Sequence, residues 1–180
     1  LIDIKTDKIN FVATDTRRLA ISHLQNISNE VGQLIIPKKA IIEIQKLFLD
    51  EIKISYDNTN LVIATSKMKF FTKLINGKFP DYERIIPNSL KYNLNLPKAV
   101  LIESIKLVTS LFSNIKITFT PQAIIFESLD EESESKTQID IDLNITTDFY
   151  LAVNAKYLLD FLSMSNNEKI TIGFNESNLP

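Results

Sequence analysis

The stretch Ile35–Thr65, "IIPKKAIIEIQKLFLDEIKISYDNTNLVIAT", predicts a helix followed by a β-hairpin. Pro37 stands where the first residue of a helix is expected, because the N–H that proline lacks would have no partner there. Three apolar side chains at helical spacing define one face of this helix, Ile41, Ile44 and Phe48. Two alternating strands follow around a short turn, Ile52–Asp57 and Asn60–Thr65. A helix with a single apolar face is expected to lie on a sheet rather than inside a helical bundle.

The same order of elements occurs twice more, in Asn95–Ser128, "NLPKAVLIESIKLVTSLFSNIKITFTPQAIIFES", and in Ala152–Pro180, "AVNAKYLLDFLSMSNNEKITIGFNESNLP". Pro97 lies 60 positions after Pro37, and Asn154, an expected N-cap residue, lies 57 positions after Pro97. The apolar face of the third helix is formed by Ala155, Leu158, Leu159 and Leu162. A period of this size indicates a repeated supersecondary unit.

Further alternating segments predict additional strands, at Lys67–Ile75, Ile115–Thr120, Ala123–Ser128 and Thr137–Ile145. The combination predicts the α+β class, with antiparallel sheets and helices packed on one face. The segment Gly77–Asn93, "GKFPDYERIIPNSLKYN", contains two prolines and no periodicity. It predicts a domain boundary near residues 86–92, which divides the chain into residues 1–88 and 89–180.

The composition is that of an ordinary globular protein and argues against catalysis. Hydrophobic residues make up 44% and charged residues 23% of the chain. With no Cys, one His and 3 Gly, the chain offers no thiol, no His-based metal cluster and no Gly-rich phosphate loop. Asp140 and Asp142 are assigned to the solvent face of a strand, and the acidic run Asp130–Ser135 to a solvated hairpin tip. We therefore predict a non-enzyme without metal or cofactor; a phosphate-ester hydrolase that uses surface carboxylates is the competing class.

Charge and hydropathy also limit the partners. The net charge of −2 and the pI of about 5.5 do not indicate a nucleic-acid-binding protein, so any basic surface must be local. The longest apolar runs are too short for a membrane span, and no signal peptide is visible. We therefore predict a cytoplasmic protein that has no membrane partner. Because the chain starts with Leu1 rather than Met, a piece of a longer protein is expected.

Lysines recur on each predicted helix, and one opens each of them. They are Lys38, Lys39 and Lys46 in the first helix, Lys98 and Lys106 in the second, and Lys156 in the third. On any single helix, ordinary solvated lysines explain such a pattern. Recurrence at corresponding positions favours a surface that meets phosphates without sequence preference.

The stretch Val12–Ser22, "VATDTRRLAIS", interrupts a predicted buried strand with polar residues. The residues assigned to the buried strand are Val12, Ala13, Leu19, Ala20 and Ile21. The segment Thr14–Thr16 is a turn former in which Asp15 is able to cap its own backbone. A hairpin corner does not explain the adjacent Arg17 and Arg18. An apolar crevice edged by arginines, beside the extended linker "FPDYERIIP", predicts the docking of a short peptide at a domain junction.

Four of these motifs together resemble one family, the β subunit of bacterial DNA polymerase III, the sliding clamp. "ATDTRRLA" resembles its ATDGHRLA-type stretch, "GKFPDYERIIP" resembles its G-x-F-P-D-Y-x-R linker, and "IIPKKAIIEI" and "NAKYLLDFL" match in the same order. The resemblance implies DNA-clamp domains, three to a subunit, with sheets outside and helices around a hole. It identifies residues 1–88 as the C-terminal part of the second domain with the linker. It identifies residues 89–180 as most of the third domain, without its C-terminal tail.

The resemblance implies a non-catalytic processivity factor. Members of the family encircle duplex DNA as a head-to-tail homodimer and tether the polymerase III catalytic subunit, the clamp loader and other proteins with a clamp-binding motif. Lys38, Lys39 and Lys46 match basic positions that face the DNA, and Lys98, Lys106 and Lys156 are added from their helix positions. This chain alone is not expected to form the ring, because the ring interface uses the first domain. An α+β peptide-binding adaptor that does not encircle DNA is the alternative.

Partners of the family insert a short motif, roughly Gln-x-x-Leu-Phe, into a cleft between the second and third domains. The resemblance places this cleft at Thr14, Arg17, Arg18, Leu19, Pro80, Arg84, Ile85, Phe112, Asn154 and Tyr157. Two buried anchors contribute about 1.5–3 kcal/mol each, which after ordering costs predicts roughly micromolar affinity. The family commonly has Gly or Ser in place of Thr16 and His or Tyr in place of Arg17. A narrower turn and a preference for more acidic motifs are therefore expected.

Overall fold

The computed structural model describes residues 1–109, 114–129 and 135–175. The chain divides into two compact units, Leu1–Ile86 and Pro87–Pro180. The division falls inside the proline-containing segment that follows Gly77. Phe112 and most of the acidic run Asp130–Ser135 lie outside the described residues.

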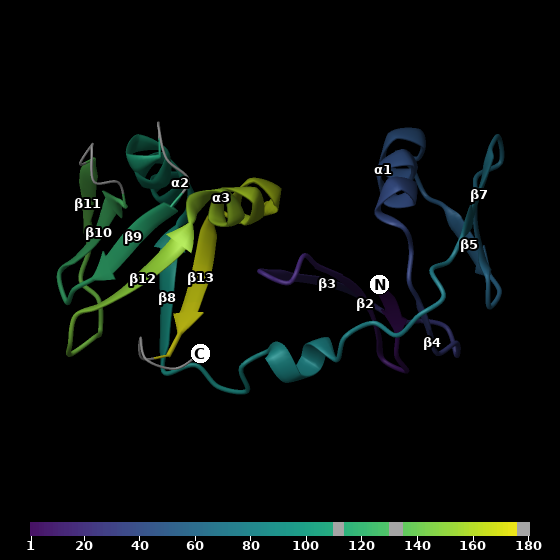
Figure 1. Ribbon diagram of the computed structural model, residues 1–180, viewed down its shortest axis with the longest axis horizontal. Coiled ribbons are helices and arrows are strands. Elements are labelled where there is room, and N and C mark those ends of the chain that lie inside the picture. Colours follow the sequence, from purple (N-terminus) through teal and green to yellow (C-terminus); the bar gives the residue numbers. More distant parts are fainter. Residues whose placement is uncertain (110–113, 130–134, 176–180) are drawn as a thin grey trace. The chain divides into compact units, whose positions relative to one another are not determined.

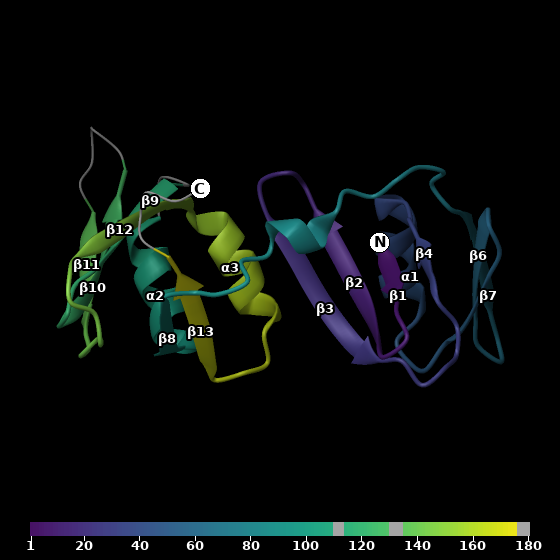
Figure 2. The ribbon, with the colours of Figure 1, turned by 90° about the horizontal axis from the view of Figure 1, so that it is seen from below.

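Unit 1 contains two antiparallel sheets, one helix and one helical turn. Its first sheet has the order β3-β2-β1-β4, built from β1 (Ile2–Ile4), β2 (Lys8–Thr14), β3 (Leu19–Gln25) and β4 (Gly32–Leu34). Helix α1 (Lys38–Leu47) leads into the second sheet, β5-β6-β7, built from β5 (Lys53–Tyr56), β6 (Asn60–Ala64) and β7 (Lys69–Lys73). The 3-10 helix η1 (Tyr82–Ile85) lies in the linker segment, on the side of the first sheet away from α1 (Figures 1 and 2).

The core of unit 1 lies between the two sheets and α1. It is formed by Ile2, Ile4, Leu34, Ile36, Ala40, Leu61 and Ile63. The predicted apolar face of α1 is wrong at Ile41, which is 37% exposed. The face that packs on the core is Ala40, Ile44 and Phe48. Residues four apart lie nearly above one another on a helix, whereas Ile41 is rotated about 100° from Ala40 and points outward.

The prediction of a buried strand around the arginine pair is also wrong in part. Only Val12 is buried and Leu19 is half-buried, while Ala13, Ala20 and Ile21 are exposed. Strand β3 is the edge strand of its sheet, so it has a strand neighbour on one side only. The core cluster of unit 1 takes no residue from β3, which leaves the apolar side chains of this edge strand to solvent.

Unit 2 has the α+β architecture expected from the repeat. Its strands and helices are β8 (Tyr92–Pro97), α2 (Lys98–Val108), β9 (Asn114–Phe119), β10 (Ala123–Ser128), β11 (Lys136–Asp140), β12 (Phe149–Asn154), α3 (Ala155–Met164) and β13 (Lys169–Phe174). The antiparallel sheets are β11-β10-β9-β12 and β13-β8, and α2 contacts α3. Figure 1 shows both helices on one side of this unit. One hydrophobic cluster joins both sheets and both helices.

The helix starts follow the predictions closely. Asn154 is the N-cap of α3, and its Oδ1 accepts a hydrogen bond from the backbone N–H of Lys156 at 3.0 Å. Ala155 and Leu162 are buried and Leu158 and Leu159 pack against the core, which confirms the predicted face. Pro37 and Pro97 were predicted to be the first helical residues but occupy the N-cap positions, so each helix begins one residue later, at Lys38 and Lys98. Each keeps an extended ψ, 139° and 121°, before the helix begins.

The predicted strand Thr137–Ile145 ends early, at Asp140. Beyond this point the backbone N–H groups of Ile141 and Leu143 donate to the carbonyls of Gln122 and Pro121, in the β9–β10 turn. Leu143 and Ile145 are still buried in the core. Asp140 and Asp142 are exposed, as predicted. Within the described ranges, no helix has the length and apolar character needed to cross a membrane.

Candidate functional site

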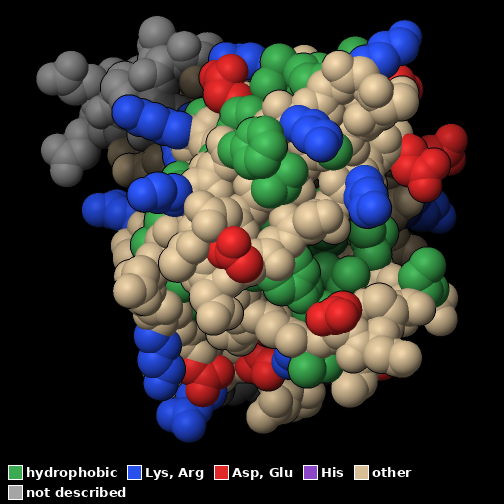
Figure 3. Space-filling model, turned by 90° about the vertical axis from the view of Figure 1, so that its right-hand side faces the viewer, with side chains coloured by type: hydrophobic (Ala, Val, Ile, Leu, Met, Phe, Trp, Pro, Cys, Tyr) green, Lys and Arg blue, Asp and Glu red, His purple; other side chains and the backbone are tan. Residues whose placement is uncertain are grey.

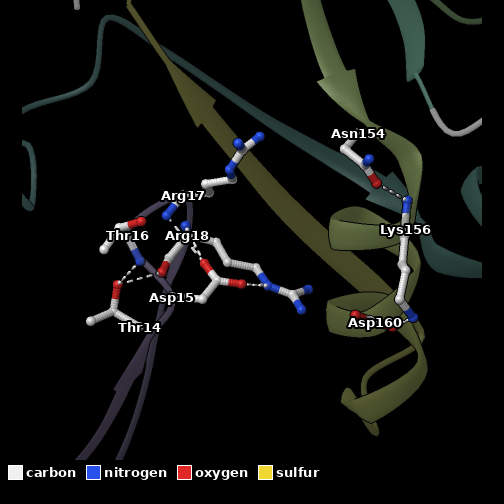
Figure 4. Close-up of polar contacts among 8 residues, drawn as sticks. All are labelled: Thr14, Asp15, Thr16, Arg17, Arg18, Asn154, Lys156 and Asp160. Atoms are coloured by element: carbon white, nitrogen blue, oxygen red, sulfur yellow. Dashed lines mark hydrogen bonds and ion pairs between the residues drawn. The ribbon is translucent and has the colours of Figure 1, made fainter.

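The β2–β3 turn is closed by its own side chains. Oδ1 of Asp15 accepts hydrogen bonds from the backbone N–H groups of Arg17 and Arg18, both at 3.1 Å. Oγ1 of Thr14 accepts from the N–H of Thr16 at 3.1 Å and donates to the carbonyl of Arg18 at 2.8 Å (Figure 4). The predicted capping role of Asp15 is confirmed. The turn therefore presents two consecutive arginines on a hydrogen-bonded corner.

Thr16 is held in an unfavourable backbone conformation. Its φ is 72°, the only positive φ of a non-Gly residue in the part of the chain that the structure describes. A β-branched residue in the left-handed region costs energy, because its Cβ crowds the following carbonyl. Local sequence patterns did not predict this strain.

The two arginines have different environments. Both are exposed, and Nε of Arg18 pairs with Oδ2 of Asp15 at 3.1 Å. Desolvation raises the pKa of Asp15, but hydrogen bonds from Arg17 and Arg18 outweigh it and lower the pKa below its usual value. The carboxylate thus remains charged at neutral pH and holds Arg18 close to the turn.

The linker presents its predicted residues outward. Pro80 and Arg84 are exposed, and Ile85 is 64% exposed. Nε of Arg84 pairs with Oδ2 of Asp81 at 2.8 Å. In Figures 1 and 2, η1 and the β2–β3 turn lie at the same end of unit 1.

Sequence patterns did not predict the residues that anchor this linker. The hydroxyl of Tyr82 donates to Oδ2 of Asp3 at 2.6 Å and accepts from Nδ2 of Asn10 at 2.9 Å, and all three residues are buried. Burial, followed by the hydrogen bond to Asp3, raises the pKa of the Tyr82 hydroxyl. One signal was available: Asp3 is a charged residue between two core isoleucines, in "LIDIK".

In unit 2, Asn154 is the last residue of β12 and the N-cap of α3, and Tyr157 lies in the first turn of α3. Both are half-buried. The side chain of Asn154 is already engaged as the N-cap, so it is held rigidly at the start of the helix (Figure 4). Phe112, the third predicted residue of this unit, lies outside the described residues.

The predicted lysines lie on all three helices. Lys38, Lys39, Lys46, Lys106 and Lys156 are exposed. Nζ of Lys46 pairs with Glu43 at 3.0 Å, and Nζ of Lys156 pairs with Asp160 at 3.3 Å (Figure 4). Lys98 is half-buried, and its Nζ donates to the carbonyl of Ser165 at 2.8 Å, at the end of α3. Exposed pairs of this kind are weak, so the lysines of α1 and α3 are able to exchange partners.

On α2, two of the predicted lysines line the same groove. The groove has a volume of about 580 Å³ and is lined by Lys98, Ala99, Ile102, Glu103, Lys106 and Leu107. Elsewhere the surface carries both signs of charge. Figure 3 shows exposed hydrophobic side chains among scattered basic and acidic ones on one side of the molecule. The described residues contain no group of three or more His, Asp or Glu side chains suited to hold a metal ion.

The chain matches two consecutive domain families. Residues 1–81 match the central domain of the DNA polymerase III beta subunit, and residues 83–180 match its C-terminal domain. The beta sliding clamp of Helicobacter pylori is 38% identical over 99% of this chain and 50% of its own length. That of Pseudomonas aeruginosa is 27% identical over 99% of this chain and 51% of its own length.

Solved structures agree with this assignment. The Helicobacter pylori beta clamp bound to a DNA ligase peptide superposes with a TM-score of 0.90 at 36% identity, over 99% of this chain and 51% of that one. The fold and the sequence thus define a DNA-clamp protein, and the α+β expectation is confirmed. The chain belongs to the DNA polymerase III beta subunit family, the beta sliding clamps, as its four motifs predicted. It spans about half the length of the curated relatives it matches.

Proposed function

We propose that this chain is part of a sliding clamp, a ring that encircles duplex DNA and tethers the polymerase and other replication or repair proteins. The observation that carries the proposal is the match of two successive clamp domains along the chain. Residues 1–88 would form the C-terminal part of the second domain with the linker, and residues 89–180 most of the third. The full-length protein would act as a cytoplasmic homodimer without catalytic activity, cofactor or metal.

The charge at the helix starts supports a role for α1, α2 and α3 in DNA binding. The first turn of each helix contains no acidic residue, although Asp and Glu are favoured there by the helix dipole. Instead α1 begins with Lys38 and Lys39, and Lys156 is the second residue of α3. Lys98 begins α2, but its Nζ donates to the carbonyl of Ser165. Backbone N–H groups and a lysine at the same helix end suit phosphate oxygens. Such contacts are independent of base sequence, as a sliding ring requires.

The peptide-binding role rests on the β2–β3 turn, the linker and the start of α3. A relative of 36% identity has been solved with a DNA ligase peptide bound. In this chain we assign the corresponding site to Thr14, Arg17, Arg18, Leu19, Pro80, Arg84, Ile85, Asn154 and Tyr157, with Phe112 as a further residue. The half-buried Leu19 and the exposed Ile85 would meet the apolar side chains of a motif. Arg17 and Arg18 would meet its carbonyls or carboxylates. The motif partners would include the polymerase III catalytic subunit and the clamp loader.

Peptide binding to the full-length protein tests this assignment. A fluorescent peptide of the Gln-Leu-x-Leu-Phe type is expected to bind with roughly micromolar affinity. Leu19→Ala and Tyr157→Ala should each weaken binding at least about 5-fold, because truncating a residue that anchors an interface costs more than about 1 kcal/mol. Tyr150→Ala, on the exposed face of β12, is the matched control. Equal affinity of all three variants and the unsubstituted protein would remove Leu19 and Tyr157 from the site.

A further inference from the structure

A row of polar side chains crosses the first sheet of unit 1 on the face opposite to the core. Asp3 on β1 is paired with Asn10 on β2 and with Gln33 on β4. Side chains alternate between the two faces of a strand, so Asp3 points away from its neighbours Ile2 and Ile4, which lie in the core. Nε2 of Gln33 donates to Oδ1 of Asp3 at 3.0 Å. The sheet thus carries a buried carboxylate on its outer face.

The ring and hydroxyl of Tyr82 cover this row. Tyr82 is 5% exposed, as are Asp3 and Asn10. Its hydroxyl donates to Asp3 and accepts from Asn10, so both its donor and acceptor capacities are used. Nζ of Lys5 donates a hydrogen bond to Oε1 of Glu83, the next residue of the linker. The same Nζ lies 3.8 Å from Oδ2 of Asp3. Two consecutive linker residues are therefore held to the sheet by polar contacts that join positions far apart in the sequence.

These contacts fix the orientation of a short turn. Tyr82, Arg84 and Ile85 all lie in η1, a 3-10 helix of four residues. A buried hydroxyl bonded to a carboxylate has a narrow range of distance and angle, unlike a purely apolar anchor. Because η1 is so short, holding Tyr82 in place also sets the direction in which Arg84 and Ile85 leave the surface.

We infer that Tyr82 is a positioning residue, which through Asp3 and Asn10 orients Arg84 and Ile85 for contact with a partner peptide. The inference rests on the proposed function. Tyr82 is itself buried and does not touch the peptide. Its role is to keep an exposed isoleucine and an exposed arginine in one arrangement before the partner arrives, which lowers the ordering cost of binding.

The test compares peptide affinity of the full-length protein with and without the hydroxyl. Tyr82→Phe keeps the ring and removes only the hydroxyl group. We expect it to weaken binding of the Gln-Leu-x-Leu-Phe type peptide about 5-fold, at a temperature where circular dichroism shows the protein folded. Tyr150→Phe, at a tyrosine that is 56% exposed, should leave affinity unchanged. In a background carrying Arg84→Ala and Ile85→Ala, Tyr82→Phe should have less than about a 2-fold effect.

The outcomes separate the inference from the proposed function. If the unsubstituted protein binds no such peptide, the proposed function fails and the inference fails with it. If that protein binds but Tyr82→Phe changes nothing, the inference alone fails. An equal loss in both backgrounds would also overturn it, because Tyr82 would then not act through Arg84 and Ile85. If Tyr82→Phe does not fold, Asn10→Ala replaces it; that variant keeps the bond between Tyr82 and Asp3, and we expect about a 2-fold loss.

Discussion

Replacing Thr16 by glycine should stabilise unit 1. Thr16 has a φ of 72°, and a non-Gly residue in the left-handed region costs about 1–3 kcal/mol. Glycine removes this strain but adds about 0.5–1 kcal/mol of backbone entropy loss on folding. The hydrogen bond that Thr16 contributes to the turn comes from its backbone N–H, so it survives the change. The net expectation for Thr16→Gly is about 1 kcal/mol of added stability.

Urea unfolding, followed by circular dichroism, measures this difference. Thr16→Ala removes the β-branch but keeps the Cβ, so it should recover only part of the gain. Thr146→Gly is the matched control, because Thr146 is exposed, lies outside regular structure and has a negative φ. That variant should lose about 0.5–1 kcal/mol. If Thr16→Gly were no more stable than Thr16→Ala, the strain assigned to this turn would be refuted.

Three further changes test other parts of the structure. Hydrogen bonds from the Asn60 side chain and from neighbouring backbone amides lower the pKa of Asp57 from 3.8 to about 2. The charged carboxylate therefore stabilises the folded state above pH 3.8, and this stabilisation is lost as the pH falls through about 2. Asp57→Asn should therefore unfold more easily at pH 6 but match the unsubstituted chain near pH 2, as urea titrations at both pH values would show. Gly173→Ala places a Cβ against the side chain of Leu90 and should cost about 1–3 kcal/mol, measurable by thermal unfolding. Because the pKa of Tyr82 is raised above 10, its protonated hydroxyl stabilises the folded state below pH 10, and this stabilisation is lost as the pH rises further. In unfolding experiments at pH 9 to 11, the free energy of unfolding of Tyr82→Phe should not show this alkaline loss.

Local patterns predicted those parts of the fold that depend on nearest neighbours. The hairpin of β9 and β10 alternates strictly, and its inward residues Ile115, Ile117 and Phe119 are all buried. Asn154 combines N-cap chemistry with an apolar face that begins at the next residue, so the start of α3 was predicted correctly. Both patterns are set within one element and its immediate turn, where spacing alone determines which side chains share a face.

Properties that depend on distant elements were not predictable in the same way. Ile41 has the periodicity of a core residue, but the sheet contacts the face that contains Ala40. Ile21 alternates like a buried residue, yet β3 lies at the edge of its sheet. The bond between Tyr82 and Asp3 joins residues 79 positions apart, and no local spacing encodes it. The chemistry of Asp15 predicted the hydrogen-bonded turn that carries Arg17 and Arg18. The contacts that anchor the linker through Tyr82 were not predicted.

Retention on DNA tests the central proposal most directly. The full-length protein would be loaded onto a nicked circular plasmid, separated from free protein by gel filtration in high salt, and the plasmid then cut once with a restriction enzyme. A ring held by topology should remain on the circle, where direct phosphate contacts are screened, and should be lost after linearisation. Equal retention before and after cutting, or no retention on the circle, would contradict encirclement and favour a peptide-binding adaptor that does not surround DNA.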